Sequence, residues 1–197
     1  MSSGRPVVNS IYAFIKLAFI FCACWILSCS SDYDKTLSEE IKKSLINDIA
    51  LVCYPRTIDS INGGFLSNFN YKWAPQTYQG KMIVTQTRHL WTISQLSLFF
   101  NDDSYKSMAR SGYDFLKSKM WDSIYGGFYT YRNQAGDKTE YDFGNFKSAY
   151  GNAFAIYGLS SYYKLTGDTT VLNLAKRTFL WLEEHSYDPE SGSCGKA

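Results

Sequence analysis

Two kinds of helix alternate along the second half of the chain, and they differ in how their apolar residues are distributed. Residues 81–100 and 145–165 carry aliphatic and aromatic side chains on nearly every face, which is typical of a helix enclosed by others. Residues 104–119 and 169–186 instead place their apolar residues on one stripe. The pattern predicts two inner helices, each followed by an outer helix. The expected stripes are formed by Met108, Tyr113, Leu116 and Met120 and by Leu172, Ala175, Phe179 and Leu182.

Polar residues mark where these helices begin. The turns NDDS at 101–104 and TGDT at 166–169 separate each inner helix from its outer helix, and their side-chain oxygens can cap the helix that follows. Near the start of the chain, Thr36 and Glu39 form a capping box. It predicts one more amphipathic outer helix over about 36–53.

The two inner-outer pairs are copies of one unit. Residues 81–127 align with residues 147–193 at a constant offset of 66, and a period of this length fits a helical hairpin with its loop. The aligned pairs are Lys81 and Lys147, Ser94 and Ser160, Asp102 and Asp168, Ala109 and Ala175, Tyr113 and Phe179, Leu116 and Leu182, and Asp122 and Asp188.

A loop with paired glycines precedes each unit, written DSINGGF at 59–65 and DSIYGGF at 122–128. Paired glycines adopt positive φ without a Cβ penalty, and the phenylalanine can fill the space between adjacent hairpins. Each loop joins an outer helix to the next inner helix, so repetition around a centre gives an all-α fold, an α/α toroid. All of these loops then emerge at the same rim.

Composition narrows the range of partners. A formal charge of +2 is too small to indicate a nucleic-acid partner. The 16 Tyr and 5 Trp supply amphipathic rings, which suit hydroxyl-rich ligands such as sugars. Cys53 and Cys194 are distant from each other and show neither a disulfide framework nor metal-ligand spacing.

The N-terminus has the features of an export signal. Arg5 and Lys16 precede the apolar run 17–27, which is too short to span a bilayer. The stretch ILSC ending at Cys29 resembles a bacterial lipobox, which implies that Cys29 is lipidated and anchors the mature protein to a membrane of the cell envelope. We expect a signal peptide at 1–28, a tether at 29–35 and a helical domain at 36–197; a plain secretory signal is the alternative.

The body of the chain resembles a known enzyme family. The segments GKMIVTQTRHLWTISQLSLFFND, ARSGYDFLKSKMWDSIYGGFY and KSAYGNAFAIYGLSSYYKLTGD occur in order, and together they are similar to the N-acylglucosamine 2-epimerase and cellobiose 2-epimerase family. The resemblance covers about 37–192. It implies a six-hairpin (α/α)6 barrel, of which about five of the twelve helices are present here, and a mono- or disaccharide substrate handled without a redox cofactor.

The expected substrate-binding residues lie on the two inner helices. Arg88 aligns with Phe154 in the repeat, so the fold alone does not require a cation there. The resemblance implies that Arg88, in the motif QTRHLW, contacts substrate oxygens; pairing with a structural carboxylate is the alternative. Trp91 and Gln95 follow at helical spacing on the same face. Tyr150 and Asn152 on the next inner helix could add contacts, or could serve packing or capping.

The resemblance also implies the chemistry. A proton is abstracted at C2 of the opened sugar to give an enediolate, which requires two bases and a cation near the oxyanion. The two histidines of the chain do not fit the role of base: His89 points about 100° around the helix from Arg88, and His185 ends an outer helix. The resemblance places the catalytic histidines beyond residue 197. We therefore expect a truncated chain without catalytic residues of its own.

Two other functions fit the same architecture. A six-hairpin glycoside hydrolase needs two carboxylates across a cleft, and the candidates are Asp102, Asp103, Asp122 and Asp142. The first three occupy turn or cap positions of the repeat, which favours a structural role. A non-catalytic, surface-anchored sugar-binding lipoprotein would use Arg88 and the surrounding aromatic residues.

Overall fold

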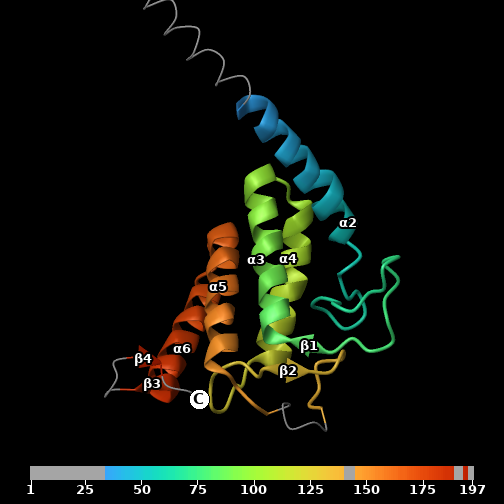
Figure 1. The fold of residues 1–197 in the computed structure, drawn as a ribbon. Helices are drawn as coiled ribbons and strands as arrows, with labels where there is room; N and C mark the ends of the chain where they lie inside the picture. The colour runs from blue at the N-terminus through green and yellow to red at the C-terminus, as the bar shows by residue number, and fades with distance from the viewer. Residues whose placement is uncertain (1–33, 140–144, 189–192, 195–197) are drawn as a thin grey trace, which may run out of the picture. The chain divides into compact units, whose positions relative to one another are not determined.

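The computed structural model describes residues 34–139, 145–188 and 193–194 (Figure 1). Residues up to Val52 form one compact unit and residues from Cys53 form a second. The first helix runs over 34–44, continues as a π-helix at Leu45–Ala50 (η1) and ends with α2, Leu51–Cys53. The helix expected over 36–53 is thus confirmed, but Thr36 lies inside it, because the chain is already helical from residue 34, and so does not cap its start. The signal peptide and Cys29 lie outside the described residues.

The second unit contains both expected inner-outer pairs. Helix α3 (Ile83–Phe100) is followed by α4 (Ser104–Phe115) and its π-helical extension η2 (Leu116–Met120). Helix α5 (Ala149–Thr166) is followed by α6 (Thr169–Ser186). Helix α3 packs against both α4 and α5, and α5 packs against α6 (Figure 1). The inner helices therefore meet each other, with an outer helix behind each.

The turns after the two inner helices repeat in structure as well as in sequence. Asn101 and Gly167 end α3 and α5 in the left-handed conformation, with φ of 51° and 68°. The next residue in each copy, Asp102 or Asp168, accepts a hydrogen bond through Oδ1 from the backbone amide two positions ahead, at 2.8 Å in both turns. Asp168 thus bonds within the first turn of α6, as the sequence predicts. Asp102 bonds to the first residue of α4, and Asp103, the N-cap of that helix, makes no side-chain cap hydrogen bond.

Two pairs of short strands lie within the second unit. Strand β1 (Lys81–Met82) pairs antiparallel with β2 (Tyr131–Arg132), and β3 (Tyr187–Asp188) pairs antiparallel with β4 (Ser193–Cys194). Because β1 leads directly into α3 and β2 follows the second glycine loop, this pairing fixes the start of one inner helix against the segment that leads to the next.

Each glycine loop is closed by an ion pair, which is fully buried in the first loop and largely buried in the second. In the first loop, Asp59 accepts hydrogen bonds from the amides of Ile61 and Asn62, and Lys81 Nζ lies 2.9 Å from Asp59 Oδ2. The side chains of this pair are 3% and 0% exposed. In the second loop, the corresponding distance from Lys147 Nζ to Asp122 Oδ2 is 2.6 Å. The two similar loop sequences therefore form the same structure, in which an Asp of the loop pairs with a Lys just before the inner helix.

A side-chain amide from the inner helix holds the phenylalanine of each loop. Gln86 Oε1 accepts from the Phe65 amide at 2.8 Å, and Gln86 Nε2 donates to the Phe65 carbonyl at 2.7 Å. Asn152, 66 positions later, makes the same two bonds to Phe128, at 2.7 and 3.2 Å. Both phenylalanine side chains are fully buried, which confirms that they fill the space between elements.

The apolar stripe of α6 differs from the expected one. Phe179 is 52% exposed, whereas Trp181 is buried and lies against the second glycine loop, where a Cβ on Gly127 would be 2.7 Å from its ring. The buried face of α6 is the one that carries Trp181. Phe179 lies two residues from Trp181, or about 200° around the helix, and therefore faces solvent. The buried residues of α6 are Val171, Leu174, Ala175, Thr178, Trp181, Leu182 and Ser186.

Candidate functional site

Arg88 lies in the second turn of α3, and its side chain is exposed. Among the described residues, no ion pair or hydrogen bond to its guanidinium is found; its backbone carbonyl accepts from Thr92 Oγ1 at 2.9 Å. A guanidinium carries five donors, and here they remain available to a ligand. The expected alternative, pairing with a structural carboxylate, is not seen in the part of the chain that the structure describes.

Arg88 borders a hollow between α3 and α5 that is lined mainly by rings, which we call the aromatic hollow. Its volume is about 540 Å³, and its lining residues are Arg88, Tyr150, Ala153, Phe154 and Tyr157. Phe154 makes edge contacts with both tyrosines, at centroid distances of 4.9 Å to Tyr150 and 6.1 Å to Tyr157. A cation beside exposed aromatic faces suits a ligand with both oxygen atoms and C–H faces.

Trp91 and Gln95 hold the two inner helices together beside this hollow. The Trp91 ring stacks on Tyr157 with centroids 5.1 Å apart and planes 16° apart. Gln95 Nε2 donates to Ser161 Oγ at 2.8 Å. Trp91 thus contacts the aromatic hollow through Tyr157, which lines it. One N–H of the Gln95 side-chain amide is already bonded within the protein.

The remaining two expected site residues differ from each other. Tyr150 lines the aromatic hollow, and 65% of it is exposed. Asn152 is fully buried, and its amide is bonded to Phe128 and to the Ser148 carbonyl. Because these bonds use the polar atoms of Asn152 on the glycine loop, we do not include it in the proposed sugar site.

Phe154 and Tyr157 line the hollow but are absent from the residues expected from the sequence. The signal that could have found them is the repeat itself. Phe154 is 66 positions after Arg88, and Tyr157 is 66 positions after Trp91. Since α3 and α5 are neighbouring copies, equivalent positions on them face the same space.

The two histidines lie away from the aromatic hollow. His89 Nδ1 is 2.9 Å from the Tyr54 hydroxyl, and its ring stacks on Phe65 at 5.0 Å. Burial, with a further contribution from the charge of Arg88, lowers the pKa of His89 to about 4. His185 stacks on Trp181 at 4.7 Å on the outer helix α6. Neither imidazole lines the aromatic hollow.

Arg88 also lines a smaller hollow on its other side, which we call the polar hollow. Its volume is about 260 Å³. The residues around it are Tyr54, Val84, Thr85, Arg88, His89 and Thr92. Arg88 and His89 therefore share this hollow, although their side chains leave the helix at different angles.

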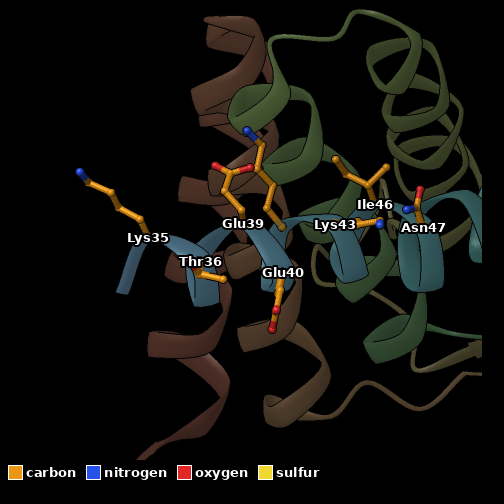
Figure 2. A pocket seen from close by; sticks show the side chains of 8 residues that line it. Lys35, Thr36, Glu39, Glu40, Lys43, Ile46 and Asn47 are labelled. Atoms are coloured by element: carbon orange, nitrogen blue, oxygen red, sulfur yellow. The ribbon is translucent and has the colours of Figure 1, made fainter. Parts of the chain in front are cut away.

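A further hollow lies in the first unit, along the helix over 34–53 (Figure 2). Figure 2 shows side chains of both charges along it, and all of them come from this one helix. The residues are Lys35, Thr36, Glu39, Glu40, Lys42, Lys43, Ile46 and Asn47. A charged surface of a single helix offers a ligand no enclosure, so we assign it no role.

The described residues give no indication of a metal centre or a membrane span. No group of three or more His, Cys, Asp or Glu residues within 34–139, 145–188 and 193–194 could hold a metal ion. In the same residues, no helix is both long and apolar enough to cross a bilayer.

The packing of inner helices against each other, with outer helices behind, defines the class of protein as an α/α hairpin toroid. A model of the N-acylglucosamine 2-epimerase (GlcNAc 2-epimerase) family matches residues 63–197. The chain belongs to this family. The family resemblance seen in the sequence is thereby confirmed.

Individual relatives agree with this assignment. The chain is 32% identical to a cellobiose 2-epimerase of Bacteroides fragilis over 82% of its own length and 40% of that protein. It is 33% identical to a cellobiose 2-epimerase of Dictyoglomus turgidum, over 76% of its own length and 37% of that protein. The 197 residues thus span about two fifths of the length of these relatives.

Solved structures confirm the fold class. The cellobiose 2-epimerase from Spirochaeta thermophila superimposes with a TM-score of 0.72 at 30% identity, covering 82% of this chain and 39% of that one. A D-mannose isomerase, at 23% identity and a TM-score of 0.67, shows likeness of fold alone. The structure therefore corresponds to part of an (α/α)6 toroid. The hairpin repeat predicts the toroid, and the family resemblance implies its six hairpins.

Proposed function

We propose that this chain forms the arginine-bearing part of a carbohydrate 2-epimerase and that the aromatic hollow binds the sugar. The observation that supports this most is the exposed guanidinium of Arg88, which has no partner among the described residues and borders a hollow of tyrosine and phenylalanine rings. The names of the relatives make a mono- or disaccharide the substrate class to test first.

Each part of the site has a distinct task in this proposal. The C–H face of a pyranose packs on the rings of Tyr150 and Tyr157, which are exposed by 65% and 44%. Arg88 donates hydrogen bonds to sugar oxygens. When the ring has opened and C2 loses its proton, negative charge develops on the enediolate oxygen, and a guanidinium at that oxygen stabilises it.

The proton transfers at C2 need bases that the described residues do not place at the aromatic hollow. His89 is bonded to Tyr54, and His185 lies on the outer helix α6. We therefore propose that these 197 residues bind sugar without converting it. The acid and base of the reaction then belong to the part of the toroid that aligns with the relatives' remaining three fifths.

A glycoside hydrolase on the same architecture remains the alternative enzyme. A family 76 glycoside hydrolase superimposes with a TM-score of 0.61 at 18% identity, a likeness of fold alone. Such an enzyme needs two carboxylates facing one cleft. Asp122 is instead bonded to Lys147, and Asp102 accepts from the amide of Ser104, while Asp142 lies outside the described residues. Of the three carboxylates that the structure describes in full, none serves the aromatic hollow.

Calorimetric titration of the 197-residue chain with cellobiose and with N-acetylglucosamine tests the proposal. Arg88→Ala should weaken binding at least about tenfold, because it removes charge-assisted hydrogen bonds. The matched control is Arg110→Ala, which removes an exposed arginine paired with Asp114 on the outer helix α4 and should bind as the parent chain does. Equal affinity of the Arg88→Ala variant and the parent would contradict the proposed site.

A second assay separates binding from turnover. The chain is incubated with cellobiose, mannobiose, mannose and N-acetylglucosamine, and the products are analysed by chromatography. The expected result is unchanged sugar. An epimer at C2 would show that these residues contain the acid and base after all. In a parallel incubation with a polysaccharide, release of reducing sugar would favour the hydrolase.

A further inference from the structure

The polar hollow on the far side of Arg88 has a lining unlike that of the aromatic hollow. The residues of α3 that line it share one side of the helix and are Val84, Thr85, Arg88, His89 and Thr92. Tyr54, from the segment before the first glycine loop, closes another side. Thus Arg88 stands on a ridge of α3 between a hollow lined by rings and one lined by hydroxyl, imidazole and guanidinium groups.

The ring of His89 is fixed in this hollow by its neighbours. Phe65 stacks on it, with planes 29° apart, and Tyr54 meets it edge-on at 5.8 Å. The Tyr54 hydroxyl, itself buried, lies 2.9 Å from Nδ1. When this hydroxyl donates to Nδ1, the imidazole hydrogen resides on Nε2. The ring then offers a positioned N–H donor without carrying a charge.

The charge balance of the hollow favours an anion. The guanidinium of Arg88 is its only formal charge at neutral pH among the six lining residues, since His89 is neutral and no Asp or Glu is among them. A guanidinium with a second N–H donor nearby is a common arrangement for binding carboxylate or phosphate oxygens. The bound oxygens would also favour the tautomer of His89 that carries hydrogen on Nε2.

We propose that the polar hollow binds a small oxyanion, a carboxylate or phosphate group, held by the guanidinium of Arg88 and by Nε2–H of His89. The inference rests on the proposed function in one respect, since Arg88 serves both hollows. An oxyanion carried by a sugar would therefore extend the ligand across the ridge of α3, and a free oxyanion would compete with the sugar for Arg88.

Titration of the 197-residue chain with inorganic phosphate at pH 7.5, followed by histidine ¹H–¹⁵N NMR, tests the binding. The Nε2–H signal of His89 should shift when phosphate accepts its hydrogen bond, while the ring signals of His185, on α6, stay unchanged as an internal reference. Loss of the His89 response in the Arg88→Ala variant is expected; Arg88→Gln serves in its place if circular dichroism shows that Arg88→Ala is unfolded. No response of His89 to phosphate would overturn the proposal.

A matched pair of variants separates the role of His89 from that of charge alone. His89→Phe keeps a ring to stack on Phe65 but removes Nε2–H, and should weaken phosphate binding about tenfold, the effect of one charge-assisted hydrogen bond. Arg110→Ala on α4 should leave it unchanged. If His89→Phe binds phosphate as the parent does, the anion is not held in the polar hollow and the inference fails.

Sugars that carry the group identify its source. Glucuronate and glucose 6-phosphate binding more tightly than glucose would indicate that the oxyanion belongs to the sugar ligand. Binding of free phosphate in competition with cellobiose, with no gain from the charged sugars, would indicate a separate anion. If neither phosphate nor a charged sugar binds while cellobiose still depends on Arg88, the oxyanion inference is wrong and the proposed function stands.

Discussion

Replacing Gln86 with methionine tests the hydrogen bonds that hold the first glycine loop to its inner helix. Methionine has nearly the shape and length of glutamine but lacks its amide. Gln86 is 1% exposed and provides the partners of both the Phe65 amide and the Phe65 carbonyl, at 2.8 and 2.7 Å. The substitution therefore leaves two buried backbone groups without partners.

The expected cost follows from those two groups. A buried donor or acceptor left unsatisfied costs about 1–3 kcal/mol, so we expect Gln86→Met to lower the free energy of unfolding by roughly 3 kcal/mol. Asn152→Leu should cost a similar amount at Phe128, because it removes the equivalent pair of bonds. Gln76→Met, in an exposed turn, serves as the control and should change it by less than about 0.5 kcal/mol.

The assay is urea unfolding followed by circular dichroism, with sugar binding measured on each folded variant. A loss below about 1 kcal/mol for Gln86→Met would refute the reasoning about the loop. A second outcome concerns Asn152 alone: if Asn152→Asp lowers sugar affinity as strongly as Arg88→Ala while stability is unchanged, then Asn152 contacts the ligand, as the sequence first indicated.

Two further substitutions test the ion pair and the helix packing. Burial raises the pKa of Asp59, but hydrogen bonds from Asn62 and Lys81 outweigh it and lower the pKa to about 2. Asp59 therefore adds about 2 kcal/mol of stability, which is lost as the pH falls from about 4 to 2. Asp59→Asn should be less stable and its free energy of unfolding in urea should depend less on pH; the same pH dependence in the variant and the parent chain would contradict this. A Cβ on Gly158 would lie 2.7 Å from the Thr87 carbonyl oxygen, so Gly158→Ala should destabilise the α3–α5 contact by about 1–3 kcal/mol, measured by the same assay against Ser160→Ala on the exposed face.

The helical hairpins were predictable because their pattern depends on local rules. Inner and outer helices differ in how many faces are apolar, and the offset of 66 between Lys81 and Lys147 links the two copies without any knowledge of the structure. The paired glycines show the positive φ that such a loop requires, for example 77° at Gly63 and 70° at Gly64. The stripe of α6 was displaced because Phe179 and Trp181 are equally apolar in sequence, and only packing on Gly127 decides between them.

The candidate site was predictable only in part. An unmatched arginine on an inner helix is visible in the repeat, since Phe154 occupies the equivalent position. The directions of polar side chains are not visible in the same way: Asn152 on an inner helix could face the centre or the glycine loop. Its counterpart Gln86 has the same choice, and the structure shows both amides on the loops. Tyr157 was missed because an aromatic residue on an inner helix is normally part of the core.

The central claim is that Arg88 and the rings of α5 bind a sugar. The most direct test is a crystal structure of the chain with cellobiose. The account predicts a pyranose packed on Tyr150 or Tyr157, with one of its oxygens within hydrogen-bond distance of the Arg88 guanidinium. Cellobiose bound at another surface, or an Arg88 side chain turned away from the bound sugar, would contradict it.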